Sequence, residues 1–179
     1  MRMAPLAGLA LVGGLILLLA GCSLPRREET ACATPQTRPT ASGFCVPRWL
    51  SLKRGMALAR RGPGFDYPPL FTYRSRGLPV QVVAETAEWR RICDPDGGAF
   101  WIHRSQVDGR RTVLTPRDRR VPLRSRPLEG ARTVAEVNPR TLGELDRCVG
   151  GWCRIQAGDR SGWVRQTEVW GVQAAAQCR

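Results

Sequence analysis

An internal repeat is the feature that most restricts how this chain can fold. The segment WRRICDPDGGAFWIHRSQV, at residues 89–107, aligns with WCRIQAGDRSGWVRQTEV, at residues 152–169, and two tryptophans of each segment coincide. Upstream, LARRGP at residues 58–63 aligns with PLRSRP at residues 122–127, and the offset stays between 62 and 64 positions. A constant offset over two separate blocks indicates two units of roughly 60 residues, a size at which a lone domain is marginally stable.

Within these units, the apolar segments are short and are separated by residues that favour turns. WLSLK, MALAR, LPVQVVAE, WRRIC and AFWIH are interrupted by RRGPGFDYPP, RSRG and DPDGG. Segments of about four to eight residues, punctuated by Gly, Pro and Asp at this spacing, predict strands and leave no room for long helices. The sequence therefore predicts an all-β fold built from small barrels or sandwiches.

The order of these segments resembles that of bacterial SH3-like domains. LARRGPGFDYPPL is followed by GLPVQVVAE, WRRICD and AFWIHRSQV, and the chain continues with GRRT at residues 109–112. It is especially similar to periplasmic proteins of proteobacteria with two tandem SH3-like units. The resemblance covers about residues 45–170 and implies two tandem SH3-like β-barrels. The second unit departs from the pattern, with Arg126 where Gly62 stands, no counterpart to Gly77, and an added pair of cysteines.

The resemblance and the repeat together set the expected domain boundaries. We expect a first SH3-like domain at residues 45–111, a second, divergent one at residues 112–172, and a short C-terminal tail at residues 173–179. Before the first domain, residues 22–44 are rich in Pro, Thr, Ser and Ala and lack a hydrophobic period, which predicts a flexible tether.

The N-terminal residues have the outline of a secretion signal. After Arg2, an apolar run continues without a charge to Gly21 and ends at Cys22. Leu19, Ala20, Gly21 and Cys22 resemble the lipobox of bacterial lipoproteins, in which the signal is cut before the cysteine and lipid is joined to its thiol. We therefore expect a signal peptide at residues 1–21, lipid attachment at Cys22, and a location on the periplasmic side of the envelope, on either membrane. The alternative is an ordinary signal peptide with an accidental cysteine.

Cysteine usage agrees with an exported chain. Of seven cysteines, six remain once Cys22 is assigned to lipid, and an even number in an oxidising compartment indicates disulfides whose pairing sequence leaves open. One pair is better defined: in CVGGWC, Gly150 and Gly151 form a hairpin-turn signal that would place Cys148 and Cys153 on facing strands. The alternatives are two free thiols or a metal site. A zinc site needs four Cys or His ligands, and the chain has one histidine, so we favour the bridge and expect no metal.

The chain is strongly basic. Its formal net charge is +13, and Lys53 is the one lysine among the cations. Such a charge is either a solvated surface or a sign of an anionic partner. Outside the cytoplasm, the candidates are anionic lipid head groups, lipopolysaccharide, wall polymers and acidic proteins; nucleic acid is not expected.

Catalysis has little support in the sequence. His103 is the single histidine, and it follows a strand rather than standing beside an orienting acid. Asp94 and Asp96 lie in DPDGG, which is ordinary turn chemistry. We therefore expect a protein that is not an enzyme and needs no cofactor.

Binding is the better supported class. SH3-like barrels bind peptides across aromatic rings between loops, and arginine pairs bidentately with the carboxylates of stem peptides. In the first unit, the candidate ligand-binding residues are Tyr67, Tyr73, Arg60, Arg91, Phe100 and Trp101. Trp89 and Trp101 recur in both units, which also suits core positions. The expected function is an envelope module that binds peptidoglycan or stem peptides; the alternative is a structural adaptor that docks an envelope protein.

Overall fold

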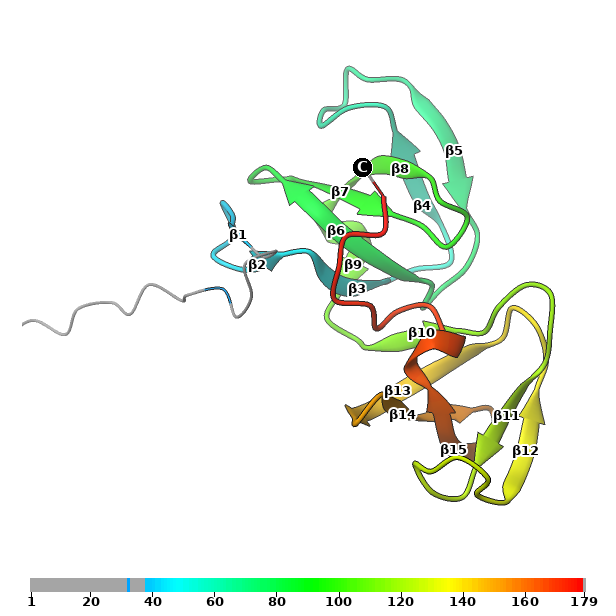
Figure 1. Ribbon diagram of the computed structural model, residues 1–179. Coiled ribbons are helices and arrows are strands. Elements are labelled where there is room, and N and C mark those ends of the chain that lie inside the picture. Colours follow the sequence, from blue (N-terminus) through cyan, green and yellow to red (C-terminus); the bar gives the residue numbers. More distant parts are fainter. Residues whose placement is uncertain (1–31, 33–37, 179) are drawn as a thin grey trace, which may run out of the picture.

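A computed structural model describes Cys32 and residues 38–178 of the chain (Figure 1). The expected signal peptide and the lipid-attachment residue Cys22 lie outside the described residues. Within them, the structure consists of strands and two short 3-10 helices, η1 (Arg104–Gln106) and η2 (Gln166–Glu168). Neither helix of this described part is long and apolar enough to cross a bilayer.

The first unit is a seven-stranded antiparallel sheet in the order β5-β4-β8-β7-β6-β3-β9. Its strands are β3 (Arg48–Leu52), β4 (Ala57–Arg60), β5 (Pro69–Tyr73), β6 (Pro79–Glu85), β7 (Trp89–Cys93), β8 (Ala99–His103) and β9 (Val107–Asp108). Every other side chain of these strands points inward, and the inward set forms a core of Leu52, Val80, Val82, Ile92 and Ile102.

The second unit repeats this pattern in a six-stranded sheet of order β10-β13-β14-β15-β11-β12. Its strands are β10 (Thr112–Leu114), β11 (Val121–Arg124), β12 (Thr133–Val137), β13 (Leu142–Val149), β14 (Trp152–Ala157) and β15 (Arg160–Arg165). Val121, Leu123, Ile155 and Val164 lie in its core. The all-β prediction and the division into two repeated units are thus confirmed.

Among the described residues, the strand pairings do not close either sheet into a barrel. The outer strands are β5 and β9 in the first sheet and β10 and β12 in the second. In each unit the sheet turns a corner where two strands meet at a single residue pair, Arg60 with Trp101 and Arg124 with Trp163. Each sheet is therefore curved, but among the described residues its two outer strands are not hydrogen-bonded to each other as they would be in a closed barrel.

Three disulfides lie in the described part of the chain: Cys32–Cys45, Cys93–Cys178 and Cys148–Cys153. Cys148 and Cys153 are directly opposite each other on β13 and β14. Gly150 and Gly151 form the turn between these strands, with φ of 55° and 79°, a backbone region that glycine enters without a steric penalty.

The end of the segment assigned to the tether is folded onto the first unit. The strand β1 (Arg38–Pro39) pairs with β2 (Cys45–Val46), and the side chains of Thr40 and Ser42 both contact the Glu85 carboxylate. This placement makes residues 38–44 part of the folded structure, and the tether that sequence alone predicts is shorter at this end.

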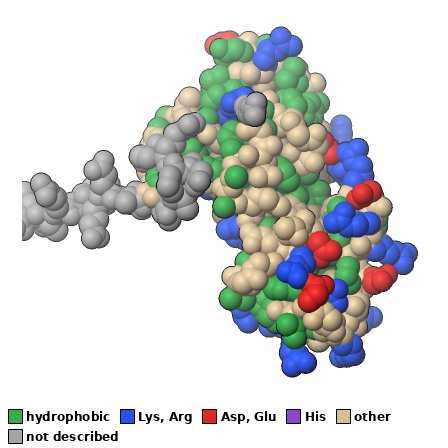
Figure 2. Space-filling view, viewed as in Figure 1, with side chains coloured by type: hydrophobic (Ala, Val, Ile, Leu, Met, Phe, Trp, Pro, Cys, Tyr) green, Lys and Arg blue, Asp and Glu red, His purple; other side chains and the backbone are tan. Residues whose placement is uncertain are grey.

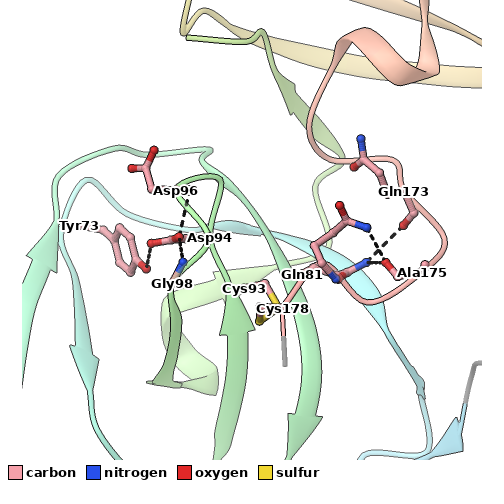
Figure 3. The surroundings of a disulfide bond; sticks show 10 residues. Tyr73, Gln81, Cys93, Asp94, Asp96, Gly98, Gln173, Ala175 and Cys178 are labelled. Carbon is pink, nitrogen blue, oxygen red and sulfur yellow. Dashed lines mark hydrogen bonds between the residues drawn. A yellow bond between two sulfur atoms is a disulfide. The ribbon is translucent and has the colours of Figure 1, made fainter.

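The two units are packed together, as the space-filling view in Figure 2 also shows, and the C-terminal segment returns to the first unit (Figure 1). Trp170 packs edge-on against Trp49 with ring centroids 4.9 Å apart, and its indole nitrogen donates to the Pro79 carbonyl at 2.9 Å. Beyond it, Gln81 donates to the carbonyls of Gln173 and Ala175, at 3.3 and 2.8 Å (Figure 3). The Cys93–Cys178 disulfide then fixes the end of this segment on β7.

Candidate functional site

One surface of the first unit combines exposed rings with arginines. On β4, β7 and β8, the residues opposite to the core set point outward, and the register pairs Trp101 with both Arg60 and Arg91. Trp89 faces His103 in the same register. We call this surface the aromatic face; its members are Arg60, Phe65, Tyr67, Trp89, Arg91, Trp101 and His103.

Phe65 is the most exposed ring of the aromatic face. It belongs to the loop at residues 61–68 and remains 72% exposed. Its ring centroid lies 5.0 Å from that of Trp89 and 5.7 Å from that of His103. Trp89 is only 6% exposed because Phe65 and His103 cover it on the outer surface. Trp89 is therefore a support beneath the exposed ring, and Phe65 is the group that a ligand would meet first.

Arg60 holds this loop in place. Its guanidinium donates to the carbonyl of Phe65 at 3.2 Å and also to the carbonyl of Tyr67. It lies 5.6 Å from the Phe65 ring centroid, within the range of a cation–π interaction. Tyr67, 45% exposed, lays its ring directly over Gly62, where a Cβ atom would overlap it. The loop conformation is thus fixed by contacts with β4 and by a glycine.

Tyr73 and Phe100 form a separate cluster. Phe71 lies between them, with ring centroids 4.8 Å from each. The Tyr73 hydroxyl donates to the Asp94 carboxylate at 2.9 Å, which also accepts from the backbone of Asp96 and Gly98 (Figure 3). Burial, together with the negative charge of Asp94, raises the pKa of Tyr73. Tyr73 therefore works as a hydrogen-bond donor within the fold.

The six residues predicted as a ligand site consequently divide into two groups. Arg60, Tyr67, Arg91 and Trp101 come together on the aromatic face. Phe100 points to the opposite side of β8 from Trp101 because neighbouring strand residues alternate, and it joins Tyr73 there. Sequence reasoning missed Phe65, although a large apolar residue in a glycine-rich turn, GPGF, is a signal for an exposed ring.

His103 and its neighbours superficially resemble catalytic groups. Its Nδ1 lies 2.8 Å from the Ser105 hydroxyl and its Nε2 3.3 Å from the Glu88 carboxylate. Ser105 is two residues away, however, and its backbone N–H also donates to Nδ1, so that His103 caps the 3-10 helix η1. Glu88 also accepts from Arg104 at 3.0 Å. This arrangement is accounted for by helix capping and surface ion pairing.

The equivalent surface of the second unit is covered by its own arginines. Arg165 lies 4.5 Å from the ring centroid of Trp152, and Arg147 lies 5.5 Å from that of Trp163. Continuing the alignment of LARRGP with PLRSRP places Glu129, which has no ring, at the position of Phe65, and the neighbouring Leu128 is an exposed apolar side chain. In the described residues, no group of three or more His, Cys, Asp or Glu side chains is placed to hold a metal ion. The chemistry that the first unit offers is contact with a flat or extended ligand by rings and guanidinium groups.

The two repeated units both match one known protein family. The family model described as bacterial SH3 domain matches residues 53–109 and again residues 117–171. The chain belongs to the bacterial SH3 domain family. Each match covers most of one sheet and begins after its first strand, β3 or β10. Each bacterial SH3 unit of the chain has its own core. No curated protein matches the chain.

Two solved structures with low sequence identity align with this SH3-type chain. NlpC1 from Trichomonas vaginalis is 12% identical, with 77% of this chain and 51% of that chain covered and a TM-score of 0.33. NlpC2 from Trichomonas vaginalis is 11% identical, with 70% and 48% covered and a TM-score of 0.31. The chain spans about half the length of either structure.

Proposed function

We propose that the protein is a non-enzymatic binding module of the cell envelope, anchored by lipid at Cys22 on the periplasmic side, that recognises peptidoglycan or its stem peptides through the aromatic face. Membership of the bacterial SH3 domain family supports a binding role in the envelope. The observation that carries the proposal is the exposed Phe65 ring, which contacts Arg60 and Trp89.

The chemistry of the aromatic face suits such a ligand. Rings bind the backbone of an extended peptide at a low entropic cost because they have few rotatable bonds. Arg60 and Arg91 stand on either side of Trp101 in the sheet register, within reach of a ligand that crosses this ring. Guanidinium groups pair with carboxylates, which stem peptides possess. Rings would therefore supply contact area, and the arginines would fix the orientation.

Co-sedimentation with purified sacculi tests this proposal. The protein is mixed with sacculi at about 0.1 M and about 1 M salt, between which the screening length falls from about 10 Å to about 3 Å. Phe65→Ala is compared with Leu128→Ala, which removes an exposed apolar side chain from the corresponding loop of the second unit. We expect pelleting that survives high salt, is lost in Phe65→Ala and is retained in Leu128→Ala. Pelleting that disappears in high salt, or equal loss in both variants, contradicts the proposal.

The lipid anchor has a separate test. In cells, Cys22→Ala should move the protein from the membrane fraction into the soluble periplasmic fraction, because a lipid-modified cysteine is the proposed attachment. Continued membrane association of Cys22→Ala would contradict lipid attachment at this residue without bearing on the aromatic face.

A structural adaptor is the second candidate, and a feature of β5 favours it. β5 is an outer strand of its sheet, and Leu70 and Phe71 on it are exposed. An outer strand with unpaired backbone groups can accept a strand from a partner protein. Melting the protein with and without muropeptides separates the two candidates, since a ligand of the folded state raises the melting temperature. An unchanged melting temperature and no pelleting would favour the adaptor.

A further inference from the structure

A second surface, unrelated to the aromatic face, lies where the two units meet. A cavity of about 590 Å³ is bordered by the loop at residues 74–78 of the first unit and by β10, β13 and β14 of the second. A neighbouring cavity of about 600 Å³ opens beside the turn between β3 and β4. Arg76 and Arg110 line both cavities, which joins them into one depression. We call it the inter-unit cleft.

Positive charge dominates the inter-unit cleft. Its lining contains five cations, Lys53, Arg54, Arg76, Arg110 and Arg111, and two carboxylates, Asp108 and Glu144. Arg110 is already paired, with Asp108 at 2.8 Å. Among the described residues, the side chains of Arg54 and Arg76 have no hydrogen-bond or ion-pair partner. The cleft thus holds more positive charge than its own carboxylates neutralise.

Two of these arginines are held in defined orientations. Asp108 binds Arg110 through both carboxylate oxygens, and Arg110 Nη2 also donates to the Lys53 carbonyl at 3.3 Å. Arg111 Nη2 donates to the Gly171 carbonyl at 3.4 Å, and burial lowers the pKa of Arg111. Fixed guanidinium groups lose less conformational entropy on binding an anion.

We propose that the inter-unit cleft binds a phosphate ester of a sugar-sized polar group. Phosphate offers three or more acceptor oxygens, which several guanidinium groups can share, whereas a carboxylate offers two. A free phosphate would leave most of the cavity unfilled. Of the remaining lining, the Thr112 hydroxyl is already bonded to Ser51 and donates to the Gly77 carbonyl. The further hydrogen-bonding groups are the side chains of Glu144 and Gln156, which are paired in the register of β13 and β14. Hydroxyl groups of a sugar match these side chains.

Calorimetric titration of the full chain, purified in nonionic detergent with its disulfides formed, tests the proposal. The soluble probe is glucose 1,6-bisphosphate, and citrate is the comparison anion because it carries a similar charge on carboxylates. Arg76→Ala/Arg111→Ala is compared with Arg126→Ala/Arg132→Ala, which removes the same charge from the exposed loop at residues 125–132. We expect the Kd for the bisphosphate to rise about tenfold or more in the first variant and less than about twofold in the control. Citrate should bind about tenfold more weakly than the bisphosphate.

A single substitution guards the test against a variant that fails to fold. Arg76→Ala alone removes an exposed side chain without partners in the described structure and should still weaken binding about threefold or more.

A second probe identifies the source of the phosphate. Micelles doped with phosphatidylglycerol provide a lipid headgroup; binding to them that depends on Arg76 assigns the phosphate to lipid, and binding to the bisphosphate alone assigns it to a soluble ester. An unchanged Kd in Arg76→Ala, equal losses in both double variants, citrate as good as the bisphosphate, or no binding to either phosphate probe overturns the proposal.

Discussion

Glu85 shows how a single buried charge can join distant segments. Its side chain has no exposed surface, and its carboxylate pairs with Arg48 at 2.6 Å and with Arg90 at 2.9 Å. It also accepts hydrogen bonds from Thr40 and Ser42, which lie more than forty positions earlier in the chain. A buried carboxylate is tolerated because every oxygen has a charged or hydroxyl partner.

Glu85→Gln should lower the free energy of unfolding by about 2 kcal/mol, since two arginines lose their shared counter-charge. Burial alone raises the pKa of Glu85, but hydrogen bonds from Ser42, Thr40 and Arg48 outweigh it and lower the pKa to about 2. The pKa is therefore lower in the folded state than in the unfolded state. The stabilisation is complete above the ordinary pKa of 4.5 and is lost as the pH falls toward 2.

Urea unfolding at several pH values checks this prediction. The difference in stability between the wild type and Glu85→Gln should be largest at neutral pH and should shrink between pH 4.5 and 2. Glu136→Gln is the control, because Glu136 is exposed and its nearest ion-pair contact, with Arg120, is 3.7 Å long. A difference that does not depend on pH would contradict the role given to the Glu85 charge.

Gly62 controls the loop of the aromatic face. Gly62→Ala places a methyl group where the Tyr67 ring now lies, so the ring must move. Because Tyr67 is a surface side chain, the free energy of unfolding should change by less than about 1 kcal/mol, while sacculus binding should fall. Co-sedimentation and thermal melting measure the two effects. Gly109→Ala, where nothing lies within 4 Å of the added atom, should change neither; equal binding by both variants would contradict a role for this loop.

At the scale of elements, the strands and the repeat were predictable because their signals are local. Alternating apolar residues and turn residues define β6, β7 and β8 from neighbouring positions, and Gly150-Gly151 does the same for the hairpin of β13 and β14. The partners of Cys93 and Cys32 depend on how distant segments meet, which no local pattern encodes. For the same reason, sequence alone did not predict the contact of Thr40 with Glu85, 45 positions away. Sequence could nominate Arg60 and Trp101, and alternation along one strand already separates Phe100 from Trp101. Only the structure shows that Phe100 joins Tyr73 through Phe71.

The disulfides offer an element-scale comparison of loop lengths. Cys148–Cys153 closes a separation of 5 positions and Cys93–Cys178 one of 85. A longer closed loop restricts the unfolded chain more, so replacing both cysteines by serine should cost about 2 kcal/mol for the first pair and about 4 kcal/mol for the second. Cys153 and Cys93 are both fully buried, whereas Cys148 is exposed and Cys178 is half-buried, so the cost of burying serine falls mainly on one residue of each pair. Guanidinium unfolding measures both; an equal loss would contradict the loop-length argument.

For the whole molecule, the two units are joined through a continuous packed region. Leu114, Leu142 and Trp170 of the second unit pack against the core of the first. Leu114 and Trp170 exchange backbone hydrogen bonds of 2.9 Å, which positions the Trp170 ring against Trp49. At the surface, Asp96 of the first unit pairs with Arg117 and with Arg140, the latter at 3.0 Å. From this packing we expect the two units to unfold together, and the same contacts hold the walls of the inter-unit cleft beside each other.

Trp170→Ala should separate the unfolding of the two units. The substitution removes the ring contact with Trp49 and the hydrogen bond to Pro79, and truncating a packed tryptophan costs about 3 to 5 kcal/mol. Calorimetry should show one thermal transition for the wild type and two for Trp170→Ala. Val149→Ala, which truncates an exposed apolar side chain of the second unit, should keep a single transition.

The Cys93–Cys178 disulfide would still hold the C-terminal segment on the first unit in Trp170→Ala, so the variant is best melted both with this bridge and with both cysteines replaced by serine. If packing at Trp170 couples the units, the transitions should separate in both backgrounds, and more widely without the bridge. If the disulfide alone couples them, Trp170→Ala should melt in one transition as long as the bridge is intact, and the packing argument would be wrong.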